Sequence, residues 1–71
     1  MQPGEMVVCK SSEILWRKAH PFDEEVGHSI PGELYLFLGY VPPIGSHAEV
    51  LHPELGVVRI IPTWLRVMNS K

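Results

Sequence analysis

The chain has 71 residues, with six Lys and Arg against eight Asp and Glu, which gives a net charge of −2. This length allows one domain, residues 1–71, with a thin hydrophobic core. The acidic balance disfavours nucleic-acid binding, because neutralising phosphates usually requires an excess of basic residues. No apolar run reaches the length of a membrane span and no signal-peptide pattern is present, so we expect a cytoplasmic protein.

The chain contains one cysteine, Cys9, so an intrachain disulfide is excluded. Cys9 follows Val7 and Val8 in an apolar run, which favours a small buried hydrophobic side chain. The alternative is a reactive thiol, but no basic cluster adjoins it in the sequence.

The first half of the chain predicts one clear strand, at residues 6–10, where β-branched and apolar residues gather. Two interpretations of residues 11–20 remain open. One is a short helix stopped by Pro21, and the other, slightly preferred, is a turn at 11–12 followed by a second strand. Residues 20–32 are acidic and contain prolines and glycines, so we expect a long loop there.

The second half predicts a more regular succession of strands. Residues 33–41 give the strongest strand signal, and a pair of prolines ends it. Residues 48–52 and 57–61 predict a hairpin, with Gly56 placed where its turn needs a positive φ. A single 3₁₀ turn at 62–65 then leads to a short last strand at 66–68.

This order of elements resembles that of the SH3-like barrel. Gly32-Glu33 opens the long strand, a hairpin follows, and Ile61-Pro62 precedes the turn and the last strand. The resemblance implies an all-β fold, a small SH3-like barrel of about five strands with a long first loop. Peptide-binding members of the superfamily open their third strand with Trp, where this chain has Ala48-Glu49, so recognition of Pro-rich peptides is not expected.

Two branches of that superfamily are closer in detail. The ending of the chain, residues 65–69, is similar to that of small bacteriophage barrels, which implies an accessory protein of a phage or mobile element. Residues 58–62 resemble the functional strand of type II, plasmid-borne dihydrofolate reductase, which reads Val-Gln-Ile-Tyr-Pro. Arg59 and Ile61 replace the Gln and Tyr that contact ligand in that family, so we expect no reductase activity.

Two predicted strands are apolar on both faces. Because side chains alternate along a strand, Leu34, Leu36 and Leu38 share one face of residues 33–41, and Tyr35 and Phe37 share the other. We assign the leucine face to the core. The expected core includes Val7, Leu36, Val50, Ile60 and Val67.

A small barrel has one inner face, so the second apolar face predicts a surface for a partner. The predicted interaction surface consists of Tyr35, Phe37, Val57, Arg59 and Ile61. The alternative is that the long first loop folds over this face and covers it.

No motif predicts catalysis, a metal site or a cofactor. The four histidines lack the spacing of a helical zinc site, and no nucleophile elbow or phosphate-binding glycine loop is present. We therefore predict a non-enzymatic protein-interaction module that forms a homo-oligomer. The alternative function is a nucleic-acid-binding small barrel, which would use Lys10, Arg17, Lys18, Arg59 and Arg66 together with Trp16 and Trp64.

Overall fold

The fold is all-β, and the computed structural model describes residues 1–17, 23–41 and 47–68. Seven strands and one 3₁₀ turn occupy these residues, and no α-helix occurs in them. The elements are β1 (Met6–Cys9), β2 (Ile14–Arg17), β3 (Glu24–His28), β4 (Leu34–Val41), β5 (His47–His52), β6 (Gly56–Ile60), η1 (Pro62–Trp64) and β7 (Leu65–Val67). No helix suited to crossing a membrane is found in the described part of the chain.

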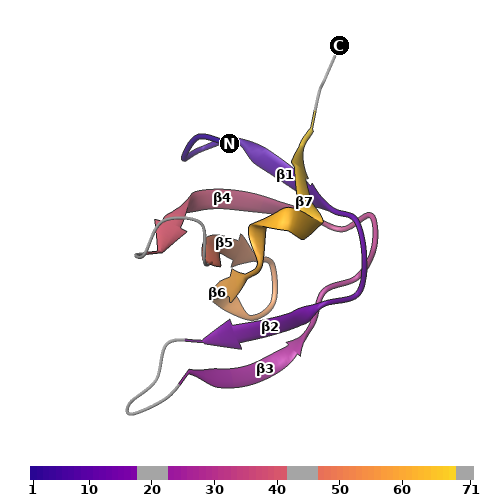
Figure 1. Ribbon diagram of the computed structural model, residues 1–71, viewed down its shortest axis with the longest axis vertical. Helices are drawn as coiled ribbons and strands as arrows, with labels where there is room; N and C mark the ends of the chain where they lie inside the picture. Colours follow the sequence, from indigo (N-terminus) through magenta and orange to yellow (C-terminus); the bar gives the residue numbers. More distant parts are fainter. Residues whose placement is uncertain (18–22, 42–46, 69–71) are drawn as a thin grey trace.

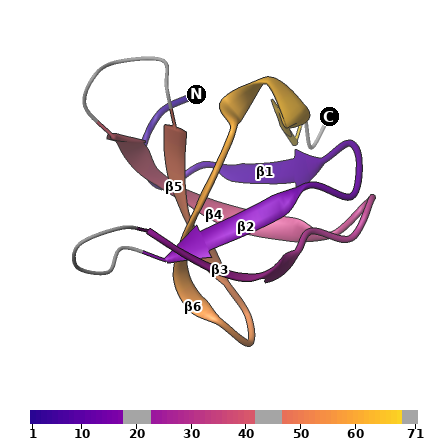
Figure 2. The same cartoon turned by 60° about the horizontal axis from the view of Figure 1, so that its bottom comes forward.

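All strand pairs are antiparallel and form one sheet in the order β3-β2-β6-β5-β4-β1-β7. The sheet curves strongly, so that β2 and β3 lie opposite β1 and β4, with β5 and β6 connecting the two layers (Figure 1). Figure 2 shows β2 and β3 crossing in front of β1 and β4. The core lies between these layers.

The hairpin chemistry of the second half is confirmed. β5 and β6 pair from Ala48↔Ile60 to His52↔Gly56, and Gly56 has a φ of +80° at the end of the turn. Only glycine adopts this backbone conformation without a steric cost, which is why the turn ends there. The 3₁₀ turn that leads into the last strand is also present, at Pro62–Trp64.

The prediction of a loop at 20–32 is wrong for residues Glu24–His28. These residues form β3, which pairs with β2 from Arg17↔Glu24 to Ile14↔His28. The strand count is therefore seven among the described residues, rather than about five. Acidic residues are unfavourable in a sheet interior, but β3 is an edge strand and Glu24 and Glu25 point into solvent. The β2 strand also decides between the two interpretations of residues 11–20 in favour of the turn and strand over Ile14–Arg17.

Three of the five predicted core residues, Val7, Val50 and Ile60, are confirmed as fully buried. The prediction that Leu36 is a core residue is wrong, because Leu36 lies on the outer face of β4 and is only half-buried. Val67 is 38% exposed, although it pairs with the buried Val7, because it lies on the edge strand β7.

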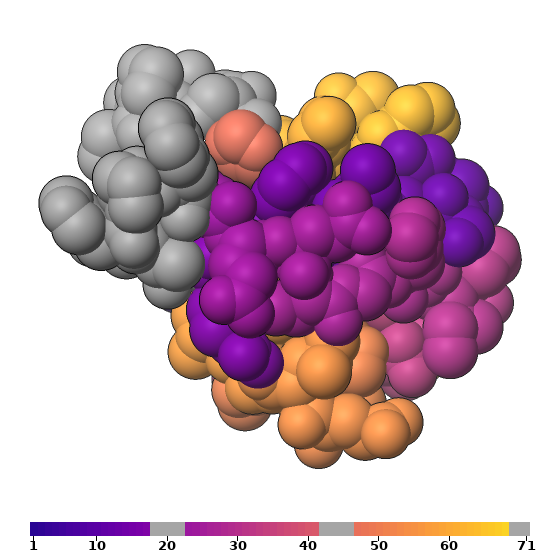
Figure 3. All heavy atoms as spheres, turned by 90° about the horizontal axis from the view of Figure 1, so that it is seen from below, coloured from indigo at the N-terminus to yellow at the C-terminus, as the bar shows by residue number. Residues whose placement is uncertain are grey.

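The full core combines aliphatic and aromatic side chains from six strands: Val7, Cys9, Leu15, Tyr35, Phe37, Ala48, Val50, Val58, Ile60 and Leu65. Val26 and Leu55 pack against it from β3 and from the β5–β6 turn. Figure 3 shows residues 23–32 as a continuous surface beside this turn. A Cβ at Gly27 would lie 3.6 Å from the Leu55 side chain, which is an ordinary van der Waals contact, so the turn lies directly beside β3 at this point.

Candidate interaction surface

The five residues predicted to form the interaction surface lie on two different faces. Tyr35 and Phe37 are fully buried in the core, so their assignment to an outer surface is wrong. Val57 and Ile61 are exposed, and Arg59 is half-buried on the outer face of β6. The structure thus leaves three of the five on the outside.

The pairing of β4 explains why its aromatic rings face inward. Tyr35 pairs with Val7 and Phe37 pairs with Val50, both core residues. Directly paired residues share a face of the sheet, so this register turns the leucines of β4 outward. Rings also fill a thin core better than leucines do, and the polar end of Tyr35 donates a hydrogen bond to Glu33.

One of the outward leucines of β4, Leu36, belongs to a continuous line of apolar side chains, which we call the apolar row: Met6, Leu36, Leu51 and Val57. The register pairs Met6 with Leu36, Leu36 with Leu51, and Leu51 with Val57, one residue from each of β1, β4, β5 and β6. Met6, Leu51 and Val57 are 41%, 43% and 48% exposed. Because directly opposed Cβ atoms lie about 5 Å apart, these side chains contact solvent as one stripe.

A pocket of about 430 Å³ adjoins the β1 end of the apolar row. Val8 and Leu34, which pair with each other, form its apolar wall, and Arg66 pairs with Val8 from the other side. Met68 closes the pocket, and its N–H donates a hydrogen bond to the carbonyl of Met6. The pocket is therefore a hollow of mixed polar and apolar lining that includes one cationic side chain, Arg66.

The charged residues on the other side of the row are paired with each other. Arg59 donates to Glu49 at 3.3 Å and to Asp23 at 3.4 Å, and its side chain is 15% exposed. Trp16 pairs with Arg59 across β2 and β6. This pairing leaves Arg59 little capacity to bind a phosphate group.

Arg17 and Arg66, two of the other basic residues expected on a nucleic-acid-binding face, make contacts of their own away from the Arg59 cluster. Arg17 donates a hydrogen bond to the carbonyl of Leu55, while Arg66 lies by the pocket. Lys18, which was also expected there, lies outside the described residues.

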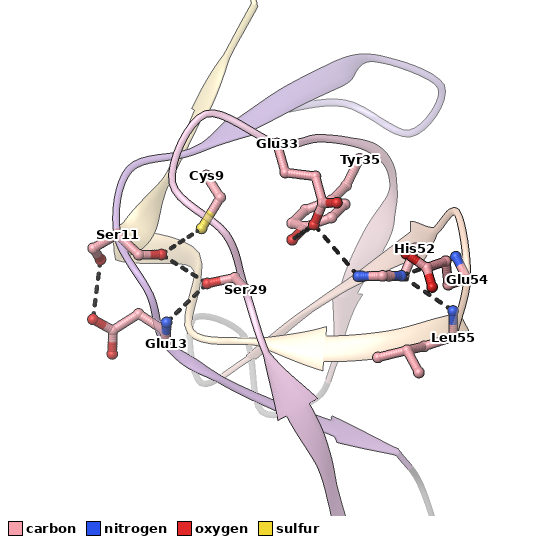
Figure 4. Close-up of polar contacts among 9 residues, drawn as sticks. All are labelled: Cys9, Ser11, Glu13, Ser29, Glu33, Tyr35, His52, Glu54 and Leu55. Atoms are coloured by element: carbon pink, nitrogen blue, oxygen red, sulfur yellow. Dashed lines mark hydrogen bonds and ion pairs between the residues drawn. The ribbon is translucent and has the colours of Figure 1, made fainter.

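A polar cluster of Glu33, Tyr35 and His52 is placed at the end of β5 (Figure 4). Nδ1 of His52 accepts hydrogen bonds from the N–H groups of Glu54 and Leu55, at 3.0 and 3.1 Å. Its Nε2 lies 3.4 Å from the Glu33 carboxylate, and its ring stacks on Tyr35 with centroids 5.2 Å apart. Burial and the hydrogen bond to Glu33 raise the pKa of Tyr35 above its usual range.

This cluster is suited to holding the turn rather than to chemistry. Both nitrogens of His52 are engaged, and its side chain is 7% exposed, so neither is available to a substrate or a metal ion. Among the described residues, no group of three or more potential ligands could hold a metal ion.

A second polar cluster joins the two long connections of the sheet (Figure 4). The buried Ser29 donates its hydroxyl hydrogen to the carbonyl of Ser11 and accepts from the N–H of Glu13, at 2.7 and 2.8 Å. The Cys9 thiol also donates to the Ser11 carbonyl, at 2.9 Å. Cys9 is 1% exposed, as the interpretation of a small buried side chain requires.

Comparison with protein-family models, with curated proteins and with solved structures gave no match for this chain.

Proposed function

We propose that this chain is a non-enzymatic protein-interaction module that self-associates through the apolar row, on a fold of the SH3-like barrel type. The observation that carries the proposal is the alignment of Met6, Leu36, Leu51 and Val57 in register across four strands. Scattered exposed apolar residues are ordinary, but a contiguous apolar patch marks a binding surface on most soluble proteins.

The strands β2 and β3 do not cover this surface. They continue the sheet beyond β6 and lie opposite β1 and β4, on the far side of the core (Figure 1). With all the described residues in place, Met6, Leu51 and Val57 are still at least 41% exposed. The alternative for the face of Tyr35 and Phe37 agrees with the structure, because Leu15 of β2 and Val26 of β3 pack in or against the same core. The proposal of a partner therefore concerns only the opposite, outer face, which carries the apolar row.

The size of the patch fits a weak homodimer. A standard interface buries about 800 Å² on each partner, which is about one sixth of the 4656 Å² accessible surface of this chain. Burying the exposed half of an aliphatic side chain contributes about 1 kcal/mol. The apolar row of two copies therefore supplies about 8 kcal/mol, against an association cost of at least about 4 kcal/mol. The row by itself thus gives a dissociation constant of about 1 mM, and a tighter dimer needs further contacts.

Other parts of the proposal rest on the sequence. A cytoplasmic setting and an accessory role in a phage or mobile element follow from composition and from the likeness of the chain ending. Nucleic-acid binding is the weaker alternative, because Arg59 is already paired with two carboxylates. Salt-sensitive binding to DNA or RNA would favour it.

The experiment that tests the proposal places a carboxylate in the middle of the row. Leu51→Glu should weaken self-association at least about tenfold in sedimentation equilibrium, because the dimer would bury two unpaired charges. Ile14→Glu is the matched control, since Ile14 is 38% exposed but lies on β2, away from the row. Equal association of wild type and Leu51→Glu, or equal weakening by both variants, would contradict the proposal.

A further inference from the structure

We propose that the β5–β6 turn of one copy occupies the pocket at the β7 end of a second copy, with Glu54 of the first facing Arg66 of the second. This inference rests on the proposed self-association and specifies its geometry. The two elements lie at opposite ends of the apolar row. Arg66 is two residues before Met68, whose N–H donates a hydrogen bond to the carbonyl of Met6 at one end of the row. Glu54 is three residues before Val57, at the other end.

Two simple symmetries would stack one apolar row on another. A two-fold axis along the row places like ends together, but it puts the pocket and the turn of one copy on the opposite side of the row from those of its mate, so that Arg66 gains no acidic partner. A two-fold axis parallel to the strands, passing between β4 and β5, reverses one row relative to the other. It brings the pocket end of one copy onto the turn end of its mate, twice per dimer.

Charge selects the second symmetry. Like charges across an interface are repulsive, whereas opposite charges fix the register of association. Glu54 is exposed, and the ion pairs among the described residues use Glu33, Glu49 and Asp23 as acids. Neither Glu54 nor Arg66 takes part in those pairs, so both are available to a second copy.

The pocket also has a chemistry that the turn can satisfy. Val8, Leu34 and Met68 supply the apolar part of its lining, and Arg66 supplies a positive charge. The turn offers the apolar ring of the exposed Pro53 beside the Glu54 carboxylate. The turn itself is held in place, because His52 accepts two of its N–H groups and Arg17 donates to the Leu55 carbonyl. A prearranged turn loses less conformational entropy on binding.

Charge reversal tests the arrangement in the full chain. Arg66→Glu should raise the dissociation constant of the dimer about tenfold or more, because two attractive pairs become repulsive. Adding Glu54→Arg should return it to within about threefold of the wild type. Adding Glu25→Arg instead, which gives the same net charge from the exposed edge strand β3, should leave the dimer weakened.

The outcomes separate this inference from the function on which it rests. A dimer that is sensitive to Leu51→Glu but indifferent to Arg66→Glu, or one that Glu54→Arg rescues no better than Glu25→Arg does, would overturn the placement of the turn alone. A wild-type chain that stays monomeric would overturn the proposed function as well. Circular dichroism of each variant should match the wild type, since all three positions are exposed.

Discussion

Replacing His52 with alanine removes the acceptor that holds two N–H groups of the β5–β6 turn. Each such hydrogen bond contributes about 1 kcal/mol net, and the N–H groups of this exposed turn recover part of it from water. The substitution also removes a buried ring that stacks on Tyr35 and faces Glu33. We expect a loss of about 2–3 kcal/mol in the free energy of unfolding, a large part of the stability of a domain this small.

His52→Asn is the matched variant, because its side-chain oxygen can accept the same N–H groups while the ring is lost. We expect it to recover about 1 kcal/mol relative to His52→Ala. Urea denaturation followed by tryptophan fluorescence measures both, since Trp16 is half-buried on β2. A free energy of unfolding for His52→Ala within about 0.5 kcal/mol of the wild-type value would refute the role assigned to His52 as hydrogen-bond acceptor of the turn. So would an asparagine variant no more stable than the alanine variant.

The other buried polar groups give two further predictions. Ser29→Ala should cost about 1–3 kcal/mol in urea denaturation, because the buried N–H of Glu13 loses its acceptor; a value near zero would show that water replaces the hydroxyl. The raised pKa of Tyr35 means that the folded state keeps the phenol neutral at pH values where the unfolded chain ionises it. Stability should therefore be unaffected by this group below about pH 10 and should fall as the pH rises above that value. Tyr35→Phe should show a shallower fall in urea midpoint over the same range, and identical slopes would contradict the assignment.

Much of the fold was predictable because its signals are local. The turn before β6 needs a residue with positive φ, and Gly56 supplies it. The 3₁₀ turn at Pro62–Trp64 likewise stands where the sequence indicates. The proline pair at 42–43 lies outside the described residues. Val7, Val50 and Ile60 are correct core predictions because each alternates with residues of lower hydrophobicity or pairs with a buried partner.

The candidate site was harder to predict because it depends on pairing between strands. Residues 34–38 are apolar on both faces, so alternation alone does not decide whether Tyr35 or Leu36 is buried. The register Tyr35↔Val7 decides it, together with the position of Glu33 as acceptor for the tyrosine hydroxyl.

The β3 strand was missed for a different physical reason. Glutamate has a low strand propensity, which argues against a strand here, but this low propensity matters mainly at positions that become buried in the sheet. At the edge of the sheet, Glu24 and Glu25 stay exposed while Val26 reaches the core. Such a strand is defined by its partner β2 more than by its own composition.

The central claim is that two copies meet through the outer apolar face, and sedimentation equilibrium of the wild-type chain over about 10–500 µM tests it most directly. The account predicts a mass that rises with concentration from the 8.0 kDa of one chain toward twice that value. A mass that stays at 8.0 kDa over the whole range would contradict it.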